Sequence, residues 1–166
     1  MPDSSLILAY DSLKDPRDLA EVLHLATGLG AEVHLIGGSL DPRHWKVLRK
    51  LRSWRPRLAE APSEISAERF EDAGAWAERA RRRGFELVAA VVEGGDAPWS
   101  RHLAPKTAVL FGEETHGLSK ESLALCSTRW TIPLGPGGRF YTIGQATALV
   151  LGAALARGSS APPELA

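Results

Sequence analysis

Three short segments of this chain are almost continuously apolar, and this feature restricts its fold more than any other. The segments are residues 86–92, 107–111 and 130–134. A strand with one face in water alternates polar and apolar side chains, so an unbroken apolar run indicates a strand buried on both faces. Such strands are typical of parallel sheets. We therefore expect an α/β fold with a mostly parallel sheet covered by helices on both faces.

Helical patterns lie between the strand candidates. Two further strands are predicted at residues 5–10 and 32–37. The predicted helices are one that starts at Asp15-Pro16 and ends at Gly28 and Gly30, a short one around 45–51, one at 67–83 and a last one at 143–157. We expect a single domain over residues 1–158 and a flexible tail over residues 159–166.

Composition excludes several classes of protein. Twenty basic residues balance twenty acidic ones, which argues against a generally basic nucleic-acid coat protein but allows a local basic face. The single cysteine, Cys126, excludes an intrachain disulfide and a multi-cysteine metal site, and we predict no metal site. Residues 140–156 are uncharged but short and contain Thr, Gln and Gly, so we expect a buried helix and not a membrane span. No signal peptide is recognisable, which favours a cytoplasmic location.

Each of the last three predicted strands ends in a loop that contains glycine. The loops are residues 93–95, 112–114 and 135–138. The carboxyl ends of parallel strands meet at one edge of the sheet, where ligands bind in α/β folds. Glycine lets backbone amides approach a ligand closely, although each loop taken alone is also ordinary turn chemistry. Together the three loops predict a binding site at this edge.

Three motifs resemble those of the SpoU/TrmH family of RNA 2′-O-ribose methyltransferases. Residues 109–119 (VLFGEETHGLS) resemble the second motif, Ile132-Pro133-Leu134 the start of the third, and residues 15–26 with Gly30-Ala31 the first. The resemblance implies the SPOUT fold, an α/β sheet with a C-terminal trefoil knot. It also implies S-adenosylmethionine as cofactor and tRNA or rRNA as substrate. Carried over by motif, the expected cofactor contacts are Val91, Val92, Gly112, Ile132, Leu134 and Tyr141.

The chain departs from the family at positions expected to be catalytic. Asp18 and His24 stand where the first motif has Asn and Arg, and Phe140-Tyr141-Thr142 replaces Ser-Leu-Asn in the third motif. The candidate catalytic set is therefore His24, Asp18, Glu114 and Thr142. His24 is a possible general base near neutral pH, or a histidine on a helix surface. Asp18 is alternatively a first-turn acid, and Glu114 alternatively a brace for its loop.

A basic, aromatic segment precedes the middle of the chain. Residues 43–57 contain seven Lys or Arg and no acid, interleaved with Trp45 and Trp54. Such a segment suits phosphate contacts and base stacking, and the predicted RNA contacts are Arg43, Lys46, Arg49 and Arg52. The alternative is a solvated helix whose tryptophans are anchored in the core.

Two functions remain open from the residues. One is an RNA ribose methyltransferase with a rearranged catalytic set, and the other is a non-catalytic homologue that binds cofactor or RNA. An unrelated nucleotide-binding α/β domain is a weaker third option. We also expect a homodimer through the C-terminal helix, because that helix is uncharged on all sides. In this arrangement Ile143, Ala146, Val150 and Ala154 face the sheet, whereas Leu149, Ala153 and Ala156 point outward.

Overall fold

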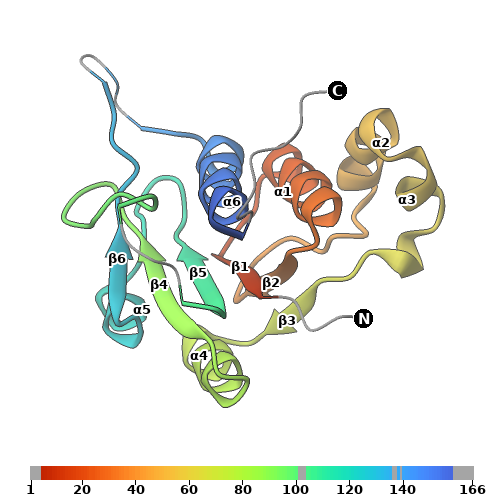
Figure 1. Cartoon of the computed structure of the whole chain (residues 1–166). Coiled ribbons are helices and arrows are strands. Elements are labelled where there is room, and N and C mark those ends of the chain that lie inside the picture. The colour runs from red at the N-terminus through yellow and green to blue at the C-terminus, as the bar shows by residue number, and fades with distance from the viewer. Residues whose placement is uncertain (1–4, 101–103, 136–137, 139, 159–166) are drawn as a thin grey trace.

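The computed structural model describes residues 5–100, 104–135, 138 and 140–158 (Figure 1). One sheet of six strands has the order β3-β2-β1-β5-β4-β6, and every pair of neighbouring strands is parallel. The strands are β1 (Leu6–Asp11), β2 (Glu32–Ile36), β3 (Glu68–Phe70), β4 (Glu86–Ala90), β5 (Thr107–Phe111) and β6 (Thr128–Trp130). The helices are α1 (Pro16–Leu29), α2 (Trp45–Trp54), α3 (Pro56–Glu60), α4 (Ala73–Arg82), α5 (Lys120–Leu125) and α6 (Ile143–Gly158), with a 3-10 turn at Pro62–Glu64.

Helices cover both faces of the sheet, as the apolar runs predict. On β1, Leu8 and Tyr10 pack into one core with residues of α1, α2 and α6. Their neighbours Ile7 and Ala9 pack into a second core with α4 on the opposite face. Figure 1 shows α1 and α6 on one side of the sheet, with α4 and α5 on the other. All five residues of β5 are buried, which confirms the prediction for residues 107–111.

The first strand lies at the centre of the sheet. β1 pairs with β2 on one side and with β5 on the other, so that Leu6 lies opposite Thr107. Its Tyr10 hydroxyl hydrogen-bonds the Thr147 hydroxyl of α6 at 2.8 Å, and both side chains are buried. The last helix is thus fixed to the first strand.

The ends of α1 follow the predicted signals. The Asp15 carboxylate accepts hydrogen bonds from the backbone amides of Arg17 and Asp18, and Pro16 occupies the first turn, where its missing N–H costs nothing. Gly30 ends the helix with a left-handed φ of 72°, a conformation that glycine adopts without strain. Asp18 therefore lies in the first turn of α1.

Two predicted elements differ from the structure. Residues 67–83 are not one helix, because Glu68–Phe70 pairs with β2 as β3 and α4 begins only after Asp72, whose side chain accepts from the Ala75 amide. Residues 130–134 are not a strand either. β6 ends at Trp130, and the Thr131 amide donates to the carbonyl of Asp96, which forms an isolated parallel bridge with Trp130.

The outward face of α6 is only partly as predicted. Leu149 and Ala156 are exposed, but Ala153 is buried, so its predicted outward position is wrong. α6 lies against α1 as well as the sheet, and at the buried Gly144 a side chain would meet the Glu21 carboxylate of α1. Within the described residues no helix is both long and apolar enough to cross a membrane. The predicted tail at 159–166 lies outside the described residues.

Candidate active site

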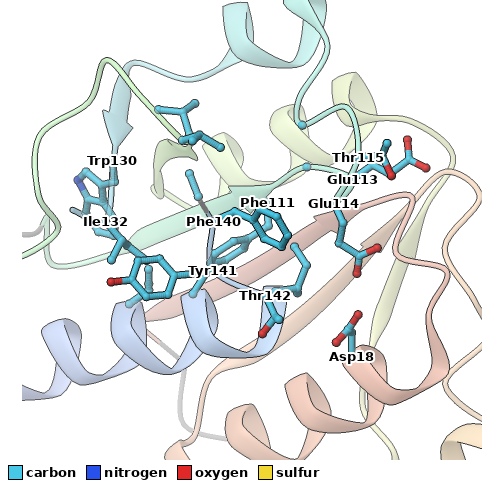
Figure 2. Close-up of a pocket in the computed structure, with 18 of the residues that line it drawn as sticks. Asp18, Phe111, Glu113, Glu114, Thr115, Trp130, Ile132, Phe140, Tyr141 and Thr142 are labelled. Atoms are coloured by element: carbon cyan, nitrogen blue, oxygen red, sulfur yellow. The ribbon is translucent and has the colours of Figure 1, made fainter. Parts of the chain in front are cut away.

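A cavity of about 430 Å³ opens at the carboxyl ends of β4, β5 and β6, beside the start of α6 (Figure 2). The loops after these three strands form its walls, which is where the glycine-bearing loops predict a site. All six residues expected to contact a cofactor line it, namely Val91, Val92, Gly112, Ile132, Leu134 and Tyr141. The structure thus brings together residues from the loops after three different strands.

One half of the cavity is apolar. Phe111 and Trp130 line it from the ends of β5 and β6, and Ile132 and Phe140 line it from the segment between β6 and α6, where Phe140 is 70% exposed. The Tyr141 hydroxyl donates to the Pro133 carbonyl at 3.0 Å, which ties the third-motif loop to the segment before α6. Phe111 and Trp130 are not among the expected site residues, although each is the last residue of its strand.

Two glycines let the walls pack backbone against backbone. A Cβ atom at Gly112 would lie 2.5 Å from the Leu118 nitrogen, so the loop after β5 closes on itself only because that atom is missing. A Cβ at Gly95 would lie 2.7 Å from the Arg129 carbonyl oxygen. The Gly95 amide also donates to the Thr131 hydroxyl at 2.9 Å. These glycines shape the cavity by chain-to-chain contact.

The other half of the cavity is acidic. Asp18 from α1 and Glu114 from the loop after β5 face each other there, and their carboxyl groups are in hydrogen-bond contact (Figure 2). The hydrogen bond to Asp18, followed by partial burial and neighbouring acids, raises the pKa of Glu114 to about 7. Glu113 lies 3.2 Å from His116 and 4.0 Å from Lys14, and both Glu113 and His116 line the cavity.

Two predicted catalytic residues have structural contacts. Thr142 lines the cavity and also caps α6, because its hydroxyl accepts from the Gln145 amide at 3.2 Å. His24 lies two turns along α1 and is not among the residues that line the cavity. Its Nδ1 accepts from Nε of Arg55 at 3.2 Å, and its ring lies 5.3 Å from that of Trp54. His24 therefore joins α1 to the end of α2.

Comparison with known proteins identifies the family. The sequence model of the SpoU rRNA Methylase family matches residues 5–152. The chain belongs to this family. It is 26% identical over 151 residues to an uncharacterized tRNA/rRNA methyltransferase of Synechocystis sp., a match that covers 90% of this chain and 53% of that protein. The chain thus spans about half the length of this curated relative.

Solved SpoU structures share the fold. The methyltransferase AviRb of Streptomyces viridochromogenes, in complex with AdoMet, has a TM-score of 0.79 at 23% identity over 97% of this chain and 61% of its own. An AdoMet-bound rRNA methyltransferase from Sinorhizobium meliloti has a TM-score of 0.80 at 21% identity, with coverages of 95% and 58%. A structure concerned with 2-OH methylation of C/U34 on tRNA has a TM-score of 0.74 at 23% identity, with coverages of 92% and 93%.

The basic segment of this SpoU-family chain forms an exposed face on α2. Trp45 is 58% exposed and Trp54 38%, so the tryptophans are not anchored in the core; Val47 and Leu51 are the buried residues of this helix. Lys46 and Arg49 lie over the Trp45 ring at 5.5 and 5.2 Å. Of the other predicted RNA contacts, Arg52 is exposed and Arg43 donates to the Pro62 carbonyl at 3.4 Å.

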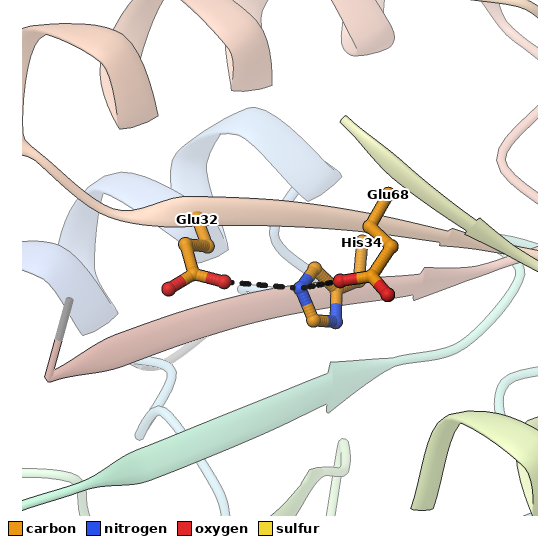
Figure 3. A group of neighbouring side chains, drawn as sticks. All are labelled: Glu32, His34 and Glu68. Carbon is orange, nitrogen blue, oxygen red and sulfur yellow. Dashed lines mark hydrogen bonds and ion pairs between the residues drawn. The ribbon is translucent and has the colours of Figure 1, made fainter. Parts of the chain in front are cut away.

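A second polar cluster lies toward the amino-terminal ends of β2 and β3, and none of its residues lines the cavity. Nε2 of the buried His34 is 3.3 Å from Glu32 and 3.6 Å from Glu68 (Figure 3), and the three ligand atoms lie within 4.8 Å of one another. That spacing suits a metal ion. However, Arg83 donates to both Glu32 oxygens at 2.7 Å, and Arg79 lies 3.4 Å from Glu68. These guanidinium groups neutralise both carboxylates and repel a divalent cation, so we assign the cluster to fold stability.

Proposed function

We propose that this chain is an S-adenosylmethionine-dependent RNA 2′-O-ribose methyltransferase. The observation that carries the proposal is the cavity after β4, β5 and β6, where the loops of a SpoU-family sequence place an apolar wall opposite a pair of carboxyl groups. The proposed substrate is a tRNA or rRNA, as the family and the named relatives suggest. Such an activity is expected in the cytoplasm.

The cavity suits S-adenosylmethionine in size and polarity. Its volume lies within the roughly 300–1,000 Å³ of small-molecule sites. Trp130, Ile132 and Tyr141 offer apolar surface for an adenine ring, and the acidic wall complements the positive charges of the sulfonium and amino groups. When bound, S-adenosylmethionine supplies an electrophilic methyl carbon. Of the polar residues that line the cavity, we expect Asp18 and Glu114 to face an incoming ribose.

Calorimetry and product analysis test this function. We expect the protein to bind S-adenosylmethionine and its demethylated product, and to transfer labelled methyl groups to tRNA or rRNA, with 2′-O-methyl nucleosides as the digestion product. Absence of binding at millimolar cofactor would contradict the proposal. Binding without transfer to any RNA pool would favour the alternative, a non-catalytic homologue. The replacement of the family's Asn and Arg by Asp18 and His24 supports that alternative.

We also propose that RNA contacts the exposed face of α2. Asp18 at the start of α1 reaches the cavity, and His24, about 9 Å farther along this helix, contacts the end of α2. α1 therefore connects the cavity to the basic face. An RNA strand that reaches the cavity can contact Lys46, Arg49 and Arg52 through its phosphates and stack a base on Trp45.

Variants of α2 separate stacking from charge. Trp45→Ala should weaken binding of a short labelled stem-loop RNA by about tenfold, because base stacking on an aromatic ring contributes roughly 1–3 kcal/mol. The double variant Lys46→Ala/Arg49→Ala should lower the slope of log Kd against log salt by about 1.4 for a single-stranded contact. Fluorescence anisotropy at several salt concentrations measures both effects. Arg82→Ala, on the opposite face of the sheet and paired with Glu78, is the matched control and should change neither.

Two further parts of the proposal concern architecture. We propose that the loops after β5 and β6 form a trefoil knot, since the parallel α/β fold matches solved SpoU methyltransferases. We also propose a homodimer through α6. Ala148, Leu149, Gly152, Leu155 and Ala156 form an uncharged, exposed face on this helix, and Leu155 is 47% exposed. A two-fold axis would cover this apolar face with its own copy.

A further inference from the structure

Two carboxyl groups meet in the cavity without a cation between them. Asp18 comes from the first turn of α1 and Glu114 from the loop after β5, and Figure 2 shows their carboxyl groups pointing toward each other. Two ionised carboxylates at hydrogen-bond distance repel, whereas one carboxylate and one carboxylic acid attract. A proton held between the two groups turns this repulsion into a hydrogen bond, and the neighbouring Asp18 carboxyl raises the pKa of Glu114.

The charges around the pair do not offset this repulsion. Asp15 and Glu113 are the other acids that act on Glu114, one from the start of α1 and one from its own loop. Arg17 is the nearby cation, but it is exposed and its Nε and Nη2 atoms donate to Asp15. Lys14 and His116 lie beside Glu113. Acids thus dominate the immediate surroundings, and the pKa of Glu114 rises.

We propose that Asp18 and Glu114 share one proton and that the pair, with Glu114 as its titrating member, accepts the hydroxyl proton during methyl transfer. This inference rests on the proposed function. In the step, the ribose oxygen forms a bond to the methyl carbon, the carbon–sulfur bond breaks with its electron pair on sulfur, and the hydroxyl proton passes to the ionised Glu114. A carboxylate whose pKa lies near the working pH is an effective general base.

His24 does not provide this base in the described arrangement. A neutral imidazole has one lone pair and one N–H, and its Nδ1 lone pair already accepts from the permanently charged Arg55. The proton then resides on Nε2, which leaves the ring without a free lone pair. The carboxyl pair fills the role that the sequence assigns to His24.

The residue at position 18 decides the protonation of Glu114. An asparagine there, as in the family motif, would donate an N–H to the Glu114 carboxylate and stabilise its charged form. An ionised aspartate destabilises the charged form of Glu114, because the two carboxylates repel each other unless a proton lies between them. Asp18→Asn keeps the size and shape of the side chain and retains the first turn of α1. It therefore tests the carboxyl pair without disturbing the fold.

NMR titration of the Glu114 side-chain carboxyl carbon, in the protein without RNA or cofactor, is the direct test. We expect a midpoint near pH 7 for the parent protein. In Asp18→Asn the midpoint should fall by roughly one to two pH units toward the ordinary value for glutamate. Glu78→Gln, on the exposed face of α4, should leave it unchanged. A parent midpoint near 4.3, the ordinary value for glutamate, overturns the pair.

The pH profile of kcat/KM supplies the second readout. In the parent protein, kcat/KM should rise with pH, with a midpoint at about pH 7. In Asp18→Asn the same rise should occur at lower pH. In Glu114→Gln this rise should be absent. An enzyme that transfers methyl groups while Glu114 titrates at its ordinary pH overturns this inference and leaves the proposed function standing. A midpoint near 7 in a protein that methylates no RNA overturns the proposed function, and the role of the pair as proton acceptor with it.

Discussion

Gly112→Val is expected to abolish cofactor binding while the sheet still forms. The added side chain would overlap the backbone of Gly117 and Leu118, which cannot yield as a flexible side chain can. The loop after β5 must therefore open, and it carries Glu113 and Glu114 with it. Because this loop forms one wall of the cavity, we expect affinity for S-adenosylmethionine to fall at least ~100-fold, equivalent to roughly 2.7 kcal/mol.

Calorimetry measures this loss, and circular dichroism checks that the secondary structure is retained. Gly135→Ala is the matched control, since a Cβ there meets no atom within 4 Å. It lies next to Leu134 of the same cavity and should bind cofactor nearly as well as the parent. Parent-like affinity in Gly112→Val would show that the loop after β5 does not contribute to the site.

Leu149→Glu should convert a dimer into monomers. Leu149 is 38% exposed on the uncharged face of α6 in the isolated chain and would be covered in the proposed interface. A two-fold interface buries the new carboxylate twice. Even ~2 kcal/mol per copy weakens association by about a thousandfold.

Light scattering at micromolar concentration distinguishes the two states. The parent should have twice the 17.9-kDa mass of the chain, and Leu149→Glu should have that mass once. Leu149→Met keeps an apolar side chain of similar volume and should remain dimeric. Ala124→Glu, on the exposed side of α5 across the sheet, controls for added charge. A monomeric parent would refute the interface on α6.

The strands and the cavity were predictable because their signals are local. The apolar side chains of residues 107–111 indicate burial on both faces, and the loops that contain glycine follow their strands directly. Parallel pairing then brings those loops to one edge without any further information. This explains why all six expected contact residues meet, although they come from three loops.

Other features depend on contacts that periodicity does not reveal. Phe70, Ala73, Ala77 and Ala80 have helical spacing, yet Glu68–Phe70 becomes a strand because β2 offers an open edge for pairing. The contact between Asp18 and Glu114 joins two distant segments, and no spacing rule links them. The hydrogen bond between Arg55 and His24 likewise depends on the packing of α1 against α2, which the sequence pattern does not predict.

The central position of β1 has a consequence for synthesis. Of the six strands of the sheet, β1 is synthesised first, but its partner β5 follows about 100 residues later, and Thr147 of α6 later still. At roughly 5–20 residues per second, the edge of β1 that pairs with β5 stays uncovered for several seconds or more. Translation that stalls before β5 therefore yields a nascent chain that cannot close its sheet and depends on chaperones or falls to proteases.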